Sequence, residues 1–111
     1  MNFLRNGTRF CKRPSMRKVN QTNSFKRDFR RESRGKYRNT LKLNGELREV
    51  VYYLENDIPL PLKYRDHLLH NNWEGTRECH IKPDFLLLYR LEGEDLLILE
   101  RLGTHSEIFG L

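Results

Sequence analysis

No run of apolar residues in this sequence is long enough to cross a membrane. A transmembrane helix needs about 20 consecutive apolar residues, whereas charged residues make up 32% of this 111-residue chain and interrupt it throughout. The first residues are basic and lack the apolar stretch of a secretory signal. We therefore expect a cytoplasmic protein with no membrane partner, formed of one domain with a modest core.

Cysteine is scarce, and the sequence motifs of several large enzyme classes are absent. Only Cys11 and Cys79 are present, and in a cytoplasmic protein we expect free thiols rather than a disulfide. The chain has no Gly-rich phosphate loop, no CxxC pair, no HExxH helix and no GxSxG turn. These absences argue against P-loop nucleotide hydrolysis, zinc sites of those spacings and α/β-hydrolase chemistry.

Acidic residues are nearly missing from the first third of the chain, which gives the sequence a strong charge asymmetry. Residues 1–38 carry 13 Lys and Arg against 2 Asp and Glu, a net charge of +11. Residues 39–111 carry 8 against 13, a net charge of −5. A polyanionic partner is one interpretation of the basic block, and a solvated helix face with a disordered basic tail is the other.

Apolar spacing predicts two helices after a short first strand. Residues 1–16 have no periodicity and are predicted to be a disordered basic extension, followed by a strand over 17–21. Thr22-Asn23-Ser24 offers N-cap candidates for a basic helix that ends near Gly35. A second helix is predicted over about 39–56 from an apolar stripe. The residues of that stripe are Leu43, Leu47, Val50, Val51 and Leu54.

Three strands are predicted in the second half, after a long polar connection over 57–75. They cover 76–81, 85–91 and 96–102 and are joined by tight turns. The last two strands show little polar alternation, so both of their faces should be covered. Residues 17–111 are thus predicted to form an α+β domain, with two N-terminal helices packed on a mostly antiparallel sheet that ends in a three-strand meander.

Three of the four histidines are predicted to converge at one edge of this sheet. His67 lies in the long connection, His80 ends the first meander strand, and His105 follows the last strand. Asp84 lies just past the turn after His80, whereas His70 stands apart. A histidine takes up and releases a proton near neutral pH. Because RNA supplies its own nucleophile, the 2′-hydroxyl, two such groups with nearby cations suffice for cleavage without a metal.

Two other interpretations of the histidines stay open from the residues alone. The first is a site for a first-row metal, although no tight HxH or HxxxH spacing is present. Its candidate ligands are His67, His80, His105 and either Asp84 or Glu78. The second is that each histidine is a solvated residue of a loop or a strand end.

Further side chains near this edge have the chemistry to contact RNA. Trp73 either anchors its loop to the core or stacks on a base. Phe109 either contacts a base or ties down the C-terminal segment. Cations that could clamp the phosphate are Lys63, Arg65, Arg77 and Lys82.

The most specific motifs are LPLKYRDH at 60–67, RECHIKPDFLLLY at 77–89 and RLGTHSEIF at 101–109. In order and spacing these segments resemble the YafQ branch of the RelE superfamily of bacterial toxins, over about 19–109. The resemblance implies a RelE-like fold. It also implies an endoribonuclease, or mRNA interferase, that cleaves mRNA in the ribosomal A site through the 2′-hydroxyl, with no metal or other cofactor.

The resemblance also implies partners and site residues. The partners are a cognate antitoxin, the ribosome with its rRNA and mRNA, and operator DNA only through the antitoxin complex. Catalytic positions of the family fall on His67, His80, Asp84 and His105, and aromatic positions fall on Phe85 and Phe109. Expected RNA contacts are these aromatic residues together with Lys63, Arg65, Arg77, Lys82 and, on the basic helix, Arg27, Arg30 and Arg31. The alternative is a non-catalytic RNA- or antitoxin-binding module of the same fold.

Overall fold

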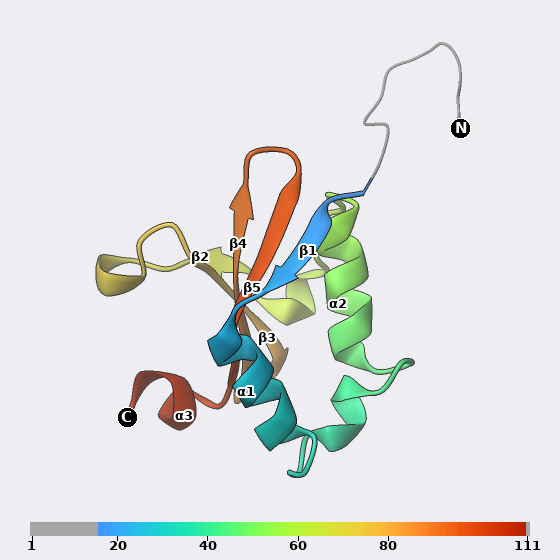
Figure 1. The fold of residues 1–111 in the computed structure, drawn as a ribbon, viewed down its shortest axis with the longest axis vertical. Helices are drawn as coiled ribbons and strands as arrows, with labels where there is room; N and C mark the ends of the chain where they lie inside the picture. The colour runs from blue at the N-terminus through green and yellow to red at the C-terminus, as the bar shows by residue number, and fades with distance from the viewer. Residues whose placement is uncertain (1–15, 111) are drawn as a thin grey trace.

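The computed structural model describes residues 16–110 and confirms an α+β fold (Figure 1). The predicted extension 1–16 therefore lies, except for Met16, outside the described residues. No helix in 16–110 has the length and apolar character needed to cross a membrane. The elements are β1 (Lys18–Gln21), α1 (Asn23–Glu32), the 3-10 turn η1 (Arg38–Leu41), α2 (Glu46–Glu55), the 3-10 turn η2 (Leu62–Tyr64), β2 (His67–Leu68), the 3-10 turn η3 (Asn71–Trp73), β3 (Arg77–Lys82), β4 (Phe85–Glu92), β5 (Leu96–Gly103) and α3 (His105–Phe109).

The sheet has five strands in the order β1-β5-β4-β3-β2. The meander β3–β4–β5 is antiparallel, as predicted, and β2 adds an antiparallel edge. At the other edge β1 runs parallel to β5, with Lys18 opposite Leu96. The chain leaves β1 at Thr22, whose hydroxyl accepts a hydrogen bond from the Phe25 amide at 2.9 Å and so caps α1.

Both faces of the central strand β4 are covered, as its uniformly apolar sequence predicted. Phe85, Leu87 and Tyr89 face the main core, which α1 and α2 close on one side of the sheet. Leu86 and Leu88 face the other side and pack with Ile108 of α3. Figure 1 shows α3 and the loop around η3 on the side of the sheet away from α2. This second, smaller core places α3 and its neighbouring residues over the meander.

The predicted second helix over 39–56 is wrong in its first half, because α2 begins only at Glu46. Gly45 is the N-cap and lies so close to the preceding turn that a Cβ atom there would be 2.5 Å from the Thr40 carbonyl oxygen. Leu43 has helical spacing to the apolar stripe but is 82% exposed. Because of this close approach α2 begins after Gly45, and Leu43 stays outside the helix and outside the core.

Short elements in two parts of the chain were not predicted from the sequence. The long connection over 57–75 contains η2, β2 and η3, and β2 pairs with β3 by placing His67 opposite Glu78. In the other part, the missed element is α3. Its signal was available, because Thr104 and Glu107 form the reciprocal hydrogen bonds of a capping box at its first turn.

Candidate active site

Three histidines from three different elements lie side by side at one end of the meander. His67 comes from β2, His80 from β3, and His105 is the first residue of α3. The ring centroids of His67 and His80 are 6.0 Å apart, and those of His80 and His105 are 5.8 Å apart. The predicted convergence of these residues is therefore present, whereas His70 is exposed and lies outside the cluster.

The alternation of β3 explains why this cluster faces outward. Cys79 and Ile81 are buried in the main core, so Glu78 and His80 take the opposite face of the strand. The register shift of the β3–β4 pairing between His80 and Lys82 then ends the regular ladder at the turn. His80 retains 10% side-chain exposure, which leaves its ring edge accessible next to a buried strand.

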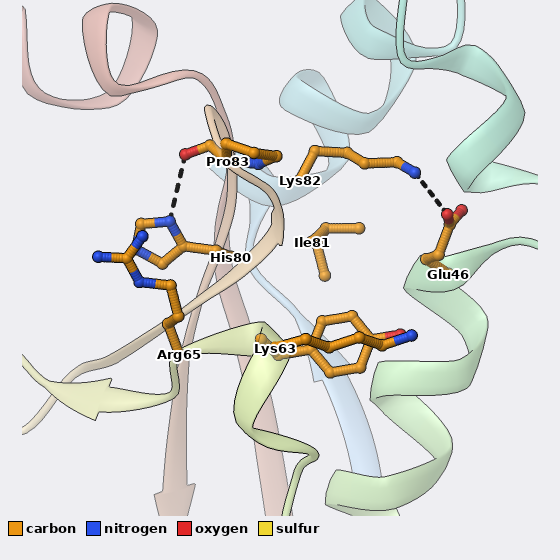
Figure 2. Close-up of a pocket in the computed structure, with 8 residues that line it drawn as sticks. Glu46, Lys63, Arg65, His80, Ile81, Lys82 and Pro83 are labelled. Atoms are coloured by element: carbon orange, nitrogen blue, oxygen red, sulfur yellow. Dashed lines mark hydrogen bonds and ion pairs between the residues drawn. The ribbon is translucent and has the colours of Figure 1, made fainter.

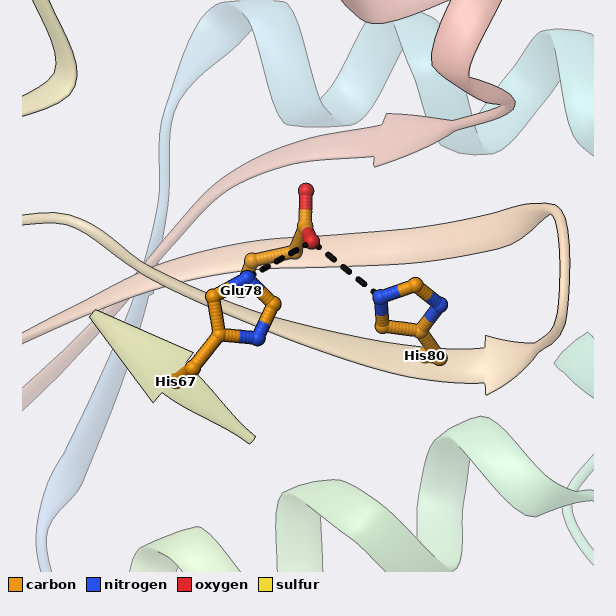
Figure 3. Close-up of side chains that lie close together, drawn as sticks. All are labelled: His67, Glu78 and His80. Atoms are coloured by element: carbon orange, nitrogen blue, oxygen red, sulfur yellow. Dashed lines mark ion pairs between the residues drawn. The ribbon is translucent and has the colours of Figure 1, made fainter. Parts of the chain in front are cut away.

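Glu78 is a buried carboxylate that joins two of the histidines (Figure 3). Its Oε1 atom lies 3.1 Å from His67 Nε2 and 3.2 Å from His80 Nε2. The other ring nitrogens also face acceptors: His67 Nδ1 is 2.8 Å from the Arg65 carbonyl, and His80 Nδ1 is 3.2 Å from the Pro83 carbonyl. Only a ring with both nitrogens protonated donates to both acceptors. All four ring nitrogens of His67 and His80 thus face oxygen atoms that can accept hydrogen bonds.

The third histidine has a different environment. His105 Nδ1 lies 2.6 Å from Asp84 Oδ1, and the His105 backbone amide donates to the same oxygen at 3.0 Å. These hydrogen bonds, the backbone one first and then the side-chain one, lower the pKa of Asp84. His105 Nε2 makes no hydrogen bond or ion pair to any residue in 16–110. This arrangement orients the ring and leaves one nitrogen available to a substrate.

A basic pocket of about 350 Å³ adjoins the cluster (Figure 2). Arg65 and Lys63 are exposed on its rim, and the Arg65 side chain points toward His80. Lys82 Nζ forms an ion pair with Glu46 Oε2 of α2 at 2.6 Å, and this hydrogen bond lowers the pKa of Glu46. Lys63 and Arg65 thus remain available to an anion, while Lys82 is shared with α2.

Two predicted RNA contacts serve the fold instead. Phe85 is fully buried and stacks on Tyr37 with ring centroids 4.5 Å apart, so its prediction as a base contact is wrong. The residue begins β4, and its side chain belongs to the main core. Arg77 pairs with Asp66 at 3.0 Å, and Asp66 also accepts a hydrogen bond from Tyr89 at 2.5 Å. This network holds the segment that presents His67.

The aromatic residues at the opposite side of the cluster anchor local segments, and one of them borders the site. Trp73 packs edge-on against Phe109, with centroids 5.7 Å apart, and both contact the smaller core. Trp73 therefore anchors its loop, as favoured from the sequence. The Phe109 ring also lies 6.4 Å from the His105 ring, so it borders the site while it ties down α3.

The basic helix α1 offers fewer free cations than its sequence implies. Arg27 and Arg30 are exposed, and the Arg27 side chain contacts only Ser24 among the interactions resolved in 16–110. Arg31 instead donates to Asp28, Glu32 and the Leu102 carbonyl at 2.9–3.0 Å. The prediction of Arg31 as an RNA contact is therefore not supported by its geometry, because these internal acceptors occupy its guanidinium.

His67, Glu78 and His80 are also a candidate metal centre. One ligand atom from each lies within 4.8 Å of the others. Two imidazoles and a carboxylate are the donor set that first-row divalent cations prefer. The same nitrogen atoms cannot hold a cation and transfer protons at the same time, so the metal and proton-transfer interpretations of the site exclude each other.

Comparison with known proteins identifies relatives of this chain in sequence and in fold. The sequence model of the family described as "Bacterial toxin of type II toxin-antitoxin system, YafQ" matches residues 17–110. The mRNA interferase toxin YafQ of Escherichia coli K12 is 37% identical over 87 residues, which cover 71% of this chain and 94% of that protein. The strain BL21-DE3 protein is 43% identical over 61 residues, covering 55% of this chain but only 65% of its own length.

Solved structures of similar toxins share the fold. A copper-bound mutant toxin from Helicobacter pylori has a TM-score of 0.73 and 40% identity, covering 85% of this chain and all of that one. YafQ from E. coli, in a complex with the antitoxin DinJ, has a TM-score of 0.70 and 33% identity, covering 85% of this chain and 98% of that one.

Proposed function

Because the chain belongs to the YafQ family of bacterial type II toxins, we propose that it is an mRNA interferase, an endoribonuclease that cleaves mRNA on the ribosome through the RNA 2′-hydroxyl. The observation that carries this proposal is the side-by-side placement of His67, His80 and His105 with Asp84 and Glu78. The names of the E. coli relatives support the same activity.

The proposed reaction needs two proton transfers around one phosphate. The 2′-oxygen forms a bond to phosphorus as it loses its proton to a base, and the bond from phosphorus to the 5′-oxygen breaks as that oxygen gains a proton from an acid. The products are a 2′,3′-cyclic phosphate and a 5′-hydroxyl end. Each positioned proton-transfer group contributes about 10²–10⁴-fold in rate. Positive groups stabilise the charge that develops on the phosphate.

We propose that different residues perform these tasks. His105 presents an unengaged Nε2 atom, held in place through Asp84, and transfers a proton to or from the RNA. His80 and His67, whose nitrogens all face acceptors, supply a second proton-transfer group. Arg65 and Lys63 line the adjacent pocket and bind phosphate.

The decisive experiment uses a defined mRNA in a purified translation reaction, to which the protein is added. We expect new RNA 5′ ends at in-frame codon positions, formed only when ribosomes are present. Cleavage without ribosomes would contradict the ribosome-dependent part of the proposal. No cleavage by folded protein would favour the alternative, a binding module of the same fold.

Glu78 is expected to support the histidines, although the sequence assigned it no part in proton transfer. Replacing Glu78 by Gln keeps the size and one hydrogen-bond acceptor but removes the charge that both rings contact. We expect the single-turnover cleavage rate to fall about 10-fold, because both rings lose the charged acceptor that orients them. An unchanged rate would show that Glu78 only fills space beneath the rings.

The exposed cations of α1 and of the turn that follows it are proposed to face ribosomal RNA. Changing Arg27, Arg30 and Arg34 to Gln together should weaken ribosome binding and lower the slope of log affinity against log salt by about 2–3. A matched triple change of the exposed acidic residues Glu92, Glu94 and Asp95 should leave that slope unaltered or raise the affinity slightly. Unchanged binding by the arginine variant would exclude this surface.

Metal independence is part of the proposal and has its own test. A first-row cation on His67, Glu78 and His80 would occupy the nitrogens that the proposed route needs. Elemental analysis of purified, cleavage-competent protein should find no stoichiometric copper, zinc, nickel or iron. A stoichiometric metal in the active protein would overturn the metal-free route; chelators are unsuitable because they also remove magnesium from the ribosome.

A cognate antitoxin is the proposed regulatory partner. E. coli YafQ crystallises in a complex with DinJ, and this chain shares the fold over 85% of its length. We infer that a partner protein binds this chain, inhibits cleavage, and brings it to operator DNA only as part of that complex. Co-expression with a DinJ-like antitoxin should yield a stable complex without cleavage activity.

A further inference from the structure

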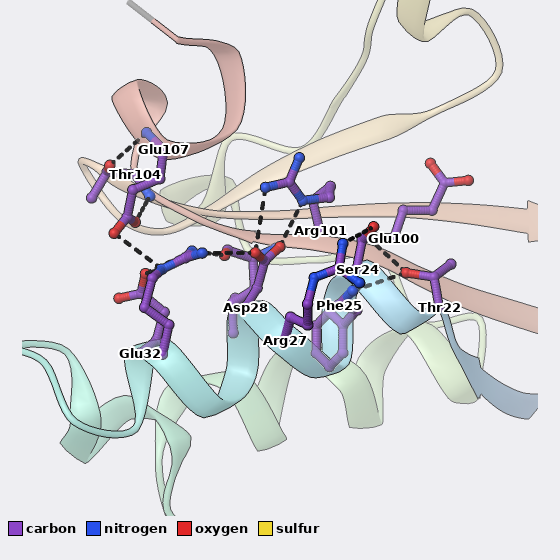
Figure 4. A network of polar contacts seen from close by, with 12 residues as sticks. Thr22, Ser24, Phe25, Arg27, Asp28, Glu32, Glu100, Arg101, Thr104 and Glu107 are labelled. Atoms are coloured by element: carbon purple, nitrogen blue, oxygen red, sulfur yellow. Dashed lines mark hydrogen bonds and ion pairs between the residues drawn. The ribbon is translucent and has the colours of Figure 1, made fainter.

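We propose that Arg31 and Glu107 are positioning residues, which fasten α3 to α1 and thereby hold the His105 imidazole beside His80. The inference rests on the proposed function, because it concerns the placement of a residue that transfers a proton in the same reaction. Its basis is a network of charged side chains that joins α1, β5 and α3 (Figure 4).

The helix α3 is short and needs outside contacts to keep a fixed direction. It has five residues, and His105 is the first of them. Ile108 packs it on the smaller core, and Asp84 holds its first turn through His105. Neither contact reaches the side of α3 that faces α1, and on that side Glu107 is the residue that makes the connection.

One carboxylate both caps α3 and joins it to α1. Glu107 Oε1 accepts a hydrogen bond from the Thr104 amide at 2.9 Å, which completes the capping box. Glu107 Oε2 lies 3.2 Å from Arg31 Nε. Glu107 lies two residues after His105 in the same helical turn. A change in the position of Arg31 is therefore transmitted to the turn that carries His105.

Arg31 is itself held from two sides. Asp28 and Glu32 contact it from α1 at 2.9 Å each, and the Leu102 carbonyl of β5 accepts from Nη2 at 3.0 Å. This contact between Arg31 and Glu107, the clamp, needs a glycine at position 103. A Cβ atom on Gly103 would lie 2.8 Å from Arg31 Nη2 and 2.9 Å from Glu107 Oε1. The local sequence thus leaves room for these two side chains to meet.

The clamp also contains a pair of carboxyl groups. Burial, followed by the hydrogen bond to Glu107, raises the pKa of Glu32 to about 7, whereas the pKa of Glu107 is lowered. A proton therefore lies between the two carboxyl groups below neutral pH, and the two charges repel each other above it. The charged groups around the pair are Arg31 and Asp28 on α1 and, through Asp28, Arg101 on β5.

The sign of the pH effect follows from the raised pKa of Glu32. The stability that this group contributes is fully present below its ordinary pKa of 4.5 and is lost as the pH rises through about 7. Glu32→Gln keeps a donor to Glu107 without the charge. Between about pH 6 and pH 8.5 we expect its melting temperature to fall less than that of the wild-type protein.

The test compares Arg31→Met, Glu107→Ala and the double variant, with Ser106→Ala as a matched change of an exposed residue on α3. Two quantities are measured: the single-turnover cleavage rate at saturating ribosomes, and the imidazole C–H resonance of His105 in the free protein. We expect each single variant to lower the rate about 5- to 10-fold and to shift the resonance. The double variant should be no slower than the singles, because both break one link.

Partial rescue separates positioning from a loss of folding. Glu107→Gln retains one of the two oxygens, which still accepts from either Thr104 or Arg31, so its rate should lie between those of wild type and Glu107→Ala. A normal maximal rate in Glu107→Ala, or an Arg31→Met defect confined to ribosome affinity, would overturn the proposal. If the wild-type protein cleaves nothing, the proposed function fails, and an unmoved His105 resonance in Glu107→Ala would still refute the clamp by itself.

Discussion

Replacing His105 by Ala should lower the rate of ribosome-dependent cleavage by about 10²-fold or more. The reason is geometric. Asp84 Oδ1 lies 2.6 Å from Nδ1 of this ring and orients it, while Nε2 is unengaged and available to the substrate. An alanine removes the nitrogen that would transfer the proton. The loss should appear in the single-turnover rate at saturating ribosomes rather than in ribosome affinity. Mapping RNA 5′ ends over time in the purified translation reaction measures it.

His70→Ala is the matched control for this variant. His70 is exposed and lies outside the cluster, so its loss should change the rate less than about 2-fold. Equal cleavage by wild type and His105→Ala would keep the protein a nuclease but move the chemistry to His67, His80 and Glu78. A loss that follows a lower melting temperature would contradict a direct role.

Asp28→Asn should be the most destabilising conservative change near the site, at about 3 kcal/mol. The Asp28 carboxylate is buried and accepts from Arg101 at 2.7 Å, from the Leu102 amide at 2.9 Å and from Arg31 at 2.9 Å. An asparagine turns an amide group toward these donors and removes the charge they share. The estimate is at the low end of the range for buried pairs, because both arginines keep some exposure.

The free energy of unfolding from urea titrations checks this value, with Asp95→Asn in an exposed turn as the control. The control should change the free energy of unfolding by less than about 0.5 kcal/mol.

Burial alone would raise the pKa of Asp28, but its hydrogen bonds from Arg101 and Leu102 hold that pKa below the usual value. The stabilisation by Asp28 is therefore present above its ordinary pKa of 3.8 and lost as the pH falls further. The variant should lack this acid-side loss, and a small destabilisation would show that Arg101 and Arg31 find other partners.

The parts of the fold that the sequence predicted well are those in which periodicity and burial agree. The three meander strands are strongly apolar, and their turns contain proline or glycine, so their bounds are within one or two residues of the prediction. The start of α2 was misplaced because Leu43 has the right spacing for a helix, while the close packing of Gly45 on Thr40 is a tertiary contact. The short strand β2 has only two residues and depends on β3 for its existence.

For the candidate site too, some features could be predicted from the sequence and others could not. The clustering of His67, His80 and His105 was predictable because strand ends and turns on one edge of a meander meet. Burial was harder to predict: Phe85 looks like a base contact by position but is a core residue. The partners of Arg31 could not be predicted, since Leu102 and Glu107 are more than 70 residues away and meet it only after the sheet forms.

The parallel pairing of β1 with β5 sets the order in which the molecule assembles. Lys18 lies opposite Leu96, 78 residues later, whereas the β4–β5 hairpin closes between Glu92 and Leu96. Closing the longer loop costs roughly 2–3 kcal/mol more chain entropy. We therefore expect the meander to form first and to bring His80 and Asp84 together by local contacts, with β1 and α1 docking later. In this order a folding chain gains the strand-borne part of its histidine cluster before the side of the site that α1 supports.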